Sequence, residues 1–272
     1  MSAPVLRVFS YLPNPRLAKA TIAARLCGIE LEIRGATPRE LAGWLWDFDA
    51  RPLADGESAD ATARAARTGF GGTLHKTDAF LAAHPFGTVP AAFSPDGATG
   101  IFESNSILRA VARLGAANTK LYGDDPYGAS RIDSFLDASL VFARDAQVYL
   151  LKLGSGKLKP PTQERARNAR DAYFGGIEQA LASAQPARAH GSGAFLVGDG
   201  LTLADICFAS EVALFSAERA HAKVLNEAGL EPLWSEALRA SFPRALAHFD
   251  RLCAHPAFAP ELGPYLAKLS LR

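Results

Sequence analysis

The chain has 272 residues, of which 49% are hydrophobic, and its 29 basic and 28 acidic side chains nearly cancel. This length can bury one large core or two modest ones, and the neutral balance argues against a nucleic-acid partner, which needs a basic face. We expect no membrane contact, because no apolar run is long enough to span a bilayer. We expect a cytoplasmic protein, because no signal-peptide pattern is visible. The three cysteines form neither a CxxC pair nor a metal-ligand cluster, which fits a reducing compartment.

The chain opens with a strand, a helix and a second strand. Residues 5–11 and 29–34 are rich in β-branched, aromatic and alternating apolar positions, which predicts strands. Residues 17–26 between them predict an amphipathic helix that stops at Gly28. Two strands joined by one helix imply a parallel pair with a right-handed crossover.

Residues 36–73 form a long excursion. We expect it to be partly helical over 38–46 and loop-like afterwards, where Gly, Ala, Asp, Arg and Ser dominate. Trp44, Trp46 and Phe48 make an apolar island in it. A connection of this length is either functional or mobile, so the island is either a wall over a binding site or a packed surface cluster.

Two strands and two helices complete the first domain. A short helix is predicted over 77–83, a hairpin with strands at 90–94 and 100–103 around a Pro-Asp-Gly turn, and a helix over 104–114. The order of elements is therefore βαβ, then a helix, then ββα.

The remainder of the chain has a helical period. Residues 116–127 are polar and predict a linker. The predicted helices cover residues 131–153, 162–184, 202–222, 238–255 and 256–263. We expect two domains, an α/β domain over 1–115 with an insertion at about 36–73 and an all-helical domain over 125–272.

The first of three motifs is Pro-Phe-Gly-Thr-Val-Pro at residues 85–90. If the Val89–Pro90 bond is cis, the chain turns sharply. The N–H and C=O of Val89 would then face outward and could pair with a peptide-like ligand. The alternative is an ordinary strand entry, where proline is tolerated.

The second motif, Glu103-Ser104-Asn105, lies at a strand-to-helix junction. Ser104 suits an N-cap, and the unpaired N–H groups of a first helical turn attract a carboxylate. Glu103 could take an ammonium group, so a ligand with both an α-amine and an α-carboxylate would fit. Plain helix capping is the alternative.

The third motif is Gly-Asp-Gly-Leu-Thr-Leu-Ala-Asp at residues 198–205. Thr202 and Asp205 have the spacing of a capping box, with Asp in place of Glu or Gln. We expect it to start a buried helix and to have no contact with a ligand.

In this order the three motifs resemble those of the cytosolic glutathione transferase superfamily, and the resemblance covers the chain from Leu6 to about Leu262. Asn14, Arg16 and Lys19 resemble the Asn-x-Arg-x-x-Lys helix entry of the elongation factor one gamma-like transferase group. Other segments similar to that group are residues 195–198, 242–243 and 255–258. The resemblance implies a thioredoxin-like α/β N-terminal domain (βαβ-α-ββα) and an all-α C-terminal domain.

The resemblance also implies a glutathione site. Members of the family hold the cysteinyl backbone of glutathione on the residue before a cis-proline, which corresponds to Val89 before Pro90. They hold the γ-glutamyl end on a Glu-Ser pair, which corresponds to Glu103 and Ser104, with Asn105 next to it.

The glycyl end of glutathione has a less regular partner here. Members often carry Lys or Gln at or near the position of Thr88. We expect Thr88 to lie at this end of the ligand, with His75 or Lys76 as a substitute for the usual residue.

The catalytic residue is less clearly marked. The family places a Tyr, Ser or Cys after the first strand, where it lowers the thiol pKa from about 8.5. We favour Asn14 and Arg16 at the helix entry, followed by Ser10. The alternative is that Arg16 pairs with an acid and Ser10 faces the core.

We expect a small electrophile to bind between the domains, near Tyr11, Phe142, Arg144 and Tyr149, although Phe142 and its neighbours could equally be core. The family resemblance further implies a homodimer and a role in detoxification. The leading function is attack of the glutathione thiolate on an electrophilic substrate by conjugation, isomerisation, ether cleavage or dehalogenation. The alternatives are a non-catalytic glutathione-binding or scaffold module and a structural protein that does not bind glutathione.

Overall fold

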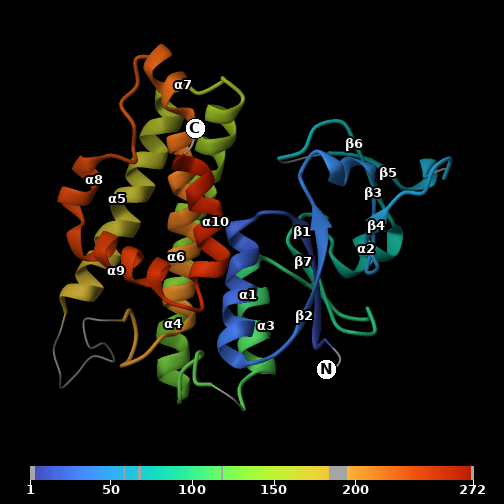
Figure 1. Cartoon of the computed structure of the whole chain (residues 1–272), viewed down its shortest axis with the longest axis horizontal. Helices are drawn as coiled ribbons and strands as arrows, with labels where there is room; N and C mark the ends of the chain where they lie inside the picture. Colours follow the sequence, from blue (N-terminus) through green and yellow to red (C-terminus); the bar gives the residue numbers. More distant parts are fainter. Residues whose placement is uncertain (1–3, 58, 67–68, 118, 184–194, 271–272) are drawn as a thin grey trace. The chain divides into compact units, whose positions relative to one another are not determined.

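The computed structural model describes residues 4–57, 59–66, 69–117, 119–183 and 195–270. They form two compact units, which lie within Met1–Thr119 and Lys120–Arg272 (Figure 1). In these described ranges no helix is long and apolar enough to cross a bilayer.

The first unit is built on a four-stranded mixed sheet. Its strands and associated helices are β1 (Leu6–Tyr11), α1 (Pro15–Cys27), β2 (Leu31–Ala36), α2 (Asp78–Ala83), β7 (Ala91–Phe93), β8 (Gly100–Phe102) and α3 (Ser104–Leu114). The strand order is β2-β1-β7-β8, with β1 parallel to β2 and antiparallel to β7. The predicted thioredoxin-like order of elements is confirmed.

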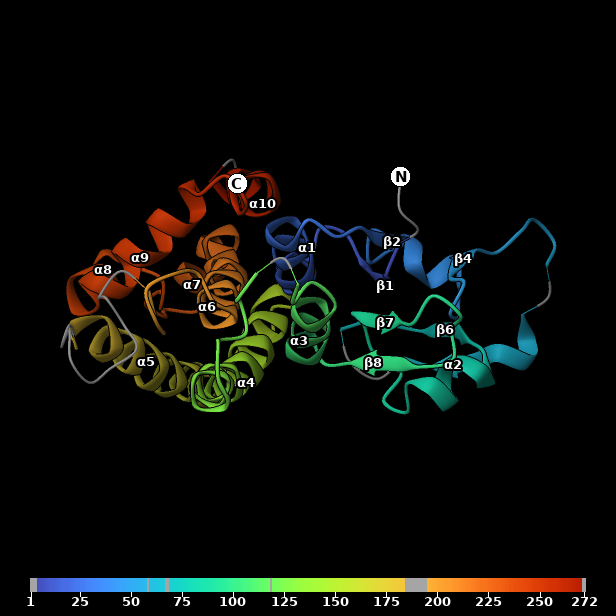
Figure 2. The same cartoon turned by 90° about the horizontal axis from the view of Figure 1, so that it is seen from below.

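The two faces of this sheet are covered by different elements. Phe9 and Phe93 point to one side, where they pack with Trp46 and Phe80 in an aromatic cluster. Val8 alternates with Phe9 and so points to the opposite side, where α1 and α3 lie next to each other (Figure 2). Phe9, Phe93, Trp46, Phe80 and Val8 are all essentially inaccessible to solvent.

The expectation for residues 36–73 is wrong, because the segment contributes to a second sheet. The strands of this sheet are β3 (Trp44–Trp46), β4 (Arg51–Pro52), β5 (Ala63–Ala65) and β6 (Thr73–Lys76), in the order β4-β3-β6-β5. The helical part is reduced to a 3₁₀ turn at Glu40–Gly43, and a second one lies at Asp60–Thr62. Strand pairing satisfies the backbone N–H and C=O groups around Trp44 and Trp46. The side chain of Trp46 is buried and donates from Nε1 to the Leu41 carbonyl oxygen.

The second unit is helical in its described residues. Its helices are α4 (Pro126–Gly154), α5 (Pro160–Ala182), α6 (Leu203–Phe215), α7 (Ala222–Glu227), α8 (Glu236–Ser241), α9 (Pro243–Ala254) and α10 (Ala259–Ser270), with a 3₁₀ segment at Ser216–His221. The predicted all-α character of this part is confirmed.

The buried helix α6 begins at the predicted capping box. Asp205 Oδ2 accepts hydrogen bonds from the N–H of Thr202 at 2.9 Å and from its hydroxyl at 3.0 Å. Asp205 Oδ1 accepts the N–H of Leu196 at 3.0 Å and lies 2.8 Å from His248 Nε2. The carboxylate thus joins three segments of the unit, and the motif is structural.

Candidate functional site

The hairpin of β7 and β8 brings the first two motifs together. Ala91 pairs with Phe102 in an antiparallel register, and the same register continued outward places Pro90 opposite Glu103. The Val89–Pro90 bond is cis. In the described part of the chain no hydrogen bond uses the N–H or C=O of Val89. A short stretch of open backbone therefore lies at the edge where α3 begins.

Two polar side chains hold the turn that leads to Val89. Lys76 Nζ donates to the carbonyl oxygen of Gly87 at 2.7 Å, and the N–H of Thr88 donates to His84 Nε2 at 3.2 Å. His84 is buried and stacked on Phe102. Its burial lowers its pKa, and an Nε2 atom that accepts a hydrogen bond has to be unprotonated. The side chains of Lys76 and neutral His84 therefore hold the turn at Gly87 and Thr88 in place from the buried side.

Thr88, His75 and Lys76 were the expected partners of the glycyl end. Thr88 is exposed, and its hydroxyl lies 3.3 Å from His84 Nε2. Lys76 is buried beneath the same turn, whereas His75 Nδ1 lies 3.1 Å from the Ala59 carbonyl oxygen, in the second sheet region. The structure brings Thr88 and Lys76 together and leaves His75 apart from them.

The γ-glutamyl end of the ligand is expected at the first turn of α3. Glu103 is exposed and has a positive φ of 66°, and Ser104 is the first helical residue and not the cap as expected. The N–H groups of Ser106 and Ile107 bond to the Glu103 carbonyl oxygen, whereas the N–H of Ser104 has no backbone partner within the described residues. Positive charge and free donors at such a turn attract an anion.

A buried lysine lies beneath this turn. Lys19 of α1 is completely buried, and its Nζ donates to Ser104 Oγ at 3.1 Å and to Asn105 Oδ1 at 2.7 Å. Asn105 is itself buried, and its side-chain oxygen Oδ1 accepts the hydrogen bond from Lys19. Lys19 is not among the predicted site residues, although a lysine between the alanines 18 and 20 of an apolar helix is a visible signal.

The three predicted catalytic residues meet at the junction of β1 and α1. Asn14 is the N-cap of α1, where its Oδ1 accepts the N–H of Arg16 at 2.9 Å and its Nδ2 donates to Ser10 Oγ at 3.0 Å. Ser10 is fully buried and Asn14 nearly so. Arg16 is the most accessible of the three. Of the two interpretations of Ser10, its burial favours the alternative in which the side chain faces the core, because its hydroxyl lies inside the unit.

The predicted electrophile residues are dispersed. Tyr11 ends β1 and packs against the aromatic cluster of the first unit. Arg144 is exposed and paired with Asp145. Phe142 and Tyr149 are core residues, which corrects the prediction that they line a ligand site: Phe142 stacks on Tyr173, and the Tyr149 hydroxyl donates to buried Glu218.

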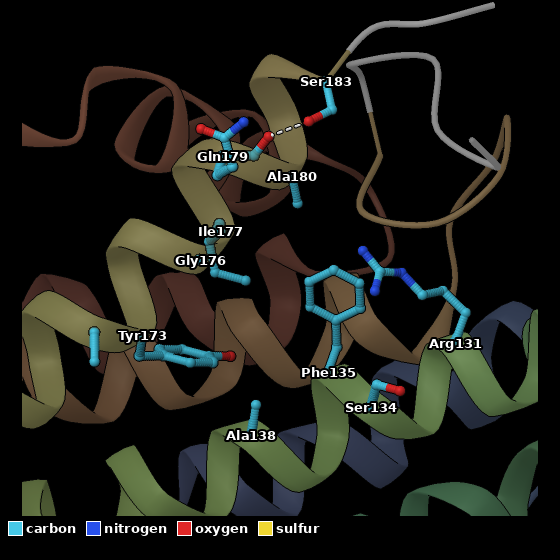
Figure 3. Close-up of a pocket in the computed structure, with 11 residues that line it drawn as sticks. Arg131, Ser134, Phe135, Ala138, Tyr173, Gly176, Ile177, Gln179, Ala180 and Ser183 are labelled. Carbon is cyan, nitrogen blue, oxygen red and sulfur yellow. Dashed lines mark hydrogen bonds between the residues drawn. The ribbon is translucent and has the colours of Figure 1, made fainter. Parts of the chain in front are cut away.

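A cavity of about 360 Å³ opens between α4 and α5 of the second unit (Figure 3). Phe135 and Tyr173 form aromatic walls, small residues such as Gly176 leave the space between them, and the Arg131 guanidinium lies over the Phe135 ring at 4.9 Å. None of the four predicted electrophile residues lines this cavity.

Known proteins resemble this chain in sequence. No family model matches it. Elongation factor 1-gamma of Prunus avium is 30% identical over 71% of this chain and 40% of its own length. The glutathione S-transferase-like protein FUS3 of Gibberella fujikuroi is 30% identical over 51% of this chain and 62% of its own length. The matched region thus spans less than two thirds of both relatives.

Known structures resemble it in fold. A glutathione S-transferase from Methylobacterium radiotolerans, solved in complex with glutathione sulfonate, superposes with a TM-score of 0.60 over 94% of both chains at 19% identity. At this identity the likeness shows the fold. The chain therefore has the glutathione transferase fold, and its sequence is similar to elongation factor 1-gamma and to a glutathione S-transferase-like protein.

Proposed function

We propose that the chain is a glutathione transferase that binds glutathione on its first unit. The cysteinyl backbone of the tripeptide pairs with the N–H and C=O of Val89, and the γ-glutamyl end lies at Glu103 and Ser104. The observation that carries the proposal is the open backbone of Val89 beside the first turn of α3. A peptide ligand can continue the antiparallel pairing there, as in strand addition to a sheet edge.

The charges at this edge suit the γ-glutamyl group. Its α-carboxylate would accept from the hydroxyl and N–H of Ser104 at the positive end of α3. Its α-ammonium would pair with the exposed carboxylate of Glu103. The two charges of one amino acid head group are thereby matched by two adjacent residues.

The chemistry requires a thiolate. With the sulfur near the start of α1, the half-buried guanidinium of Arg16 and the positive end of α1 would lower the thiol pKa. Asn14 keeps the helix entry in place through its bonds to Ser10 and Arg16. The thiolate then attacks an electrophilic carbon of a small substrate, and the new C–S bond either replaces the bond from that carbon to a leaving group, which departs as its anion, or forms by addition to a double bond. A homodimer in the cytoplasm remains part of this proposal through the family resemblance.

A second candidate is a non-catalytic glutathione-binding module. It is favoured by one observation, namely that the Ser10 hydroxyl is fully buried and the nearly buried Asn14 side chain caps α1 and donates to Ser10 Oγ, so that neither side chain lies at the surface where it could donate to the sulfur. The similarity to elongation factor 1-gamma is compatible with this candidate.

Retention on glutathione-agarose, followed by a turnover assay with a generic aromatic halide, distinguishes the candidates. A transferase is retained on the resin and converts the aromatic halide, whereas the non-catalytic module is retained but does not convert it. A protein that is not retained has neither function. Glu103→Gln and Ser104→Ala should lose retention, whereas the matched surface variant Glu57→Gln should keep it, because Glu57 pairs with Arg51 in the second sheet region.

A further inference from the structure

Lys19 is a fully buried cation in the first unit. Lysine is rarely buried to this degree unless its ammonium group is paired. Two of its hydrogen bonds go to the first two residues of α3, at 3.1 Å to Ser104 Oγ and 2.7 Å to Asn105 Oδ1. The ammonium group therefore ties α1 to the turn where the γ-glutamyl group is placed.

The direction of these bonds fixes the role of the Ser104 hydroxyl. An ammonium group donates hydrogen bonds and accepts none, whereas a hydroxyl has one proton and two lone pairs. Because Ser104 Oγ accepts from Lys19, its own proton is turned away from Lys19 and is available to an acceptor. Asn105 Oδ1 holds the ammonium group from a second direction, which limits its movement away from Ser104.

We propose that Lys19 is a positioning residue of the site: it orients the Ser104 hydroxyl as a donor to the α-carboxylate of the γ-glutamyl group and places a positive charge beneath the first turn of α3. This inference rests on the proposed binding of glutathione. It makes Lys19 a determinant of specificity, because its effect is confined to ligands that carry an α-carboxylate at this end.

A pair of ligands separates this role from a merely structural one. Glutathione contains the γ-glutamyl group, and cysteinylglycine is the same thiol peptide without it. Calorimetric titration gives the dissociation constant of each ligand. The dissociation constant of cysteinylglycine divided by that of glutathione is the ratio that measures recognition of the γ-glutamyl group. A general loss of packing would weaken both ligands and leave the ratio unchanged.

Lys19→Met removes the donors at nearly constant volume. We expect it to weaken glutathione binding by at least about tenfold, since it removes a charge-assisted bond network, and to leave cysteinylglycine binding unaltered. In a Ser104→Ala background the same substitution should have a much smaller effect, because the hydroxyl that it orients is gone. Lys120→Met, which removes an exposed lysine of the same charge in the second unit, is the matched control and should change neither ligand.

Lys19→Gln keeps a neutral donor and should give an intermediate ratio, and Asn105→Ala removes the second acceptor and should also lower the ratio. Both are measured in parallel, so a folding failure of Lys19→Met still leaves two readings. A wild-type ratio in the folded variants, or additive effects of Lys19→Met and Ser104→Ala, overturns the role of Lys19. Failure of the wild-type protein to bind glutathione would instead remove the proposed function, and this inference with it.

Discussion

The N–H of Thr88 donates to His84 Nε2 at 3.2 Å, and this bond closes the turn that leads to Val89. Burial, together with the nearby charge of Lys76, lowers the pKa of His84 below its ordinary value of 6.5. Between the lowered folded pKa and the unfolded pKa, the unfolded chain binds more protons than the folded chain. The stability provided by neutral His84 is therefore complete above about pH 6.5 and is lost as the pH falls through the folded pKa.

Urea unfolding of the wild-type protein and His84→Gln from pH 8 to pH 5 tests this dependence. The difference in unfolding free energy between the two proteins should shrink toward acidic pH. His75→Gln is the control, because His75 does not contact the turn, and its difference from wild type should lack this trend. A pH-independent difference for His84→Gln would contradict the assignment.

Glu103 combines backbone strain with a proposed ligand contact. Its φ of 66° is unfavourable for a residue with a side chain and costs about 1–3 kcal/mol. Glycine removes most of this cost but loses more entropy on folding, so Glu103→Gly should raise the free energy of unfolding by about 0.5–1 kcal/mol. It should also abolish retention on glutathione-agarose. Glu103→Gln keeps the strain and loses the charge, so a Gly variant less stable than the Gln variant would show that Glu103 is not strained.

Arg16 is the residue through which we expect the thiol to be activated. An opposite charge near a titrating group lowers its pKa by about 1–3 units. Arg16→Met should therefore raise the pKa of bound glutathione by about one unit or more, as followed by the ultraviolet absorbance of the thiolate across a pH series. Ser10→Ala is the comparison, because buried Ser10 contributes to stability through Asn14. Equal thiol pKa values in the wild-type protein and Arg16→Met would favour the non-catalytic candidate.

Asp205 is expected to be the most sensitive polar position of the second unit. Its carboxylate accepts hydrogen bonds from the N–H groups of Leu196 and Thr202 and from the Thr202 hydroxyl, and it is also hydrogen-bonded to His248. Asp205→Ala leaves several buried donors without an acceptor and should cost at least about 3 kcal/mol in urea unfolding. Asp199→Ala, at an exposed position of the preceding loop, should stay within about 0.5 kcal/mol of wild type. Similar losses in both variants would rule out the capping role.

Much of the fold could be predicted because its signals are local. The strand alternation around Val8, the stop at Gly28 and the box of Thr202 and Asp205 each depend on residues a few positions apart, and the structure has them where expected. The second sheet could not be predicted, because Leu45 pairs with His75, thirty positions further along the chain, in strands of only two to four residues. Such strands are too short for a period to show.

The site was predictable in its backbone and less so in its side chains. Motifs placed Val89 and Glu103 at one edge, since a hairpin fixes which residues face each other. Sequence alone could not show that Asn14 turns its amide to Ser10, or that Lys19 reaches the start of α3, because both depend on rotamers and on the packing of α1 against α3.

The central claim is that glutathione lies along the backbone of Val89 with its γ-glutamyl end at Ser104. Titration of the ¹⁵N-labelled protein with glutathione, followed through the amide resonances, tests this claim most directly. We predict that the Val89 and Ser104 amides shift together and saturate at the same ligand concentration, because both N–H groups gain an acceptor. Unchanged Val89 and Ser104 amides at saturating glutathione, with shifts confined to other residues, would contradict it.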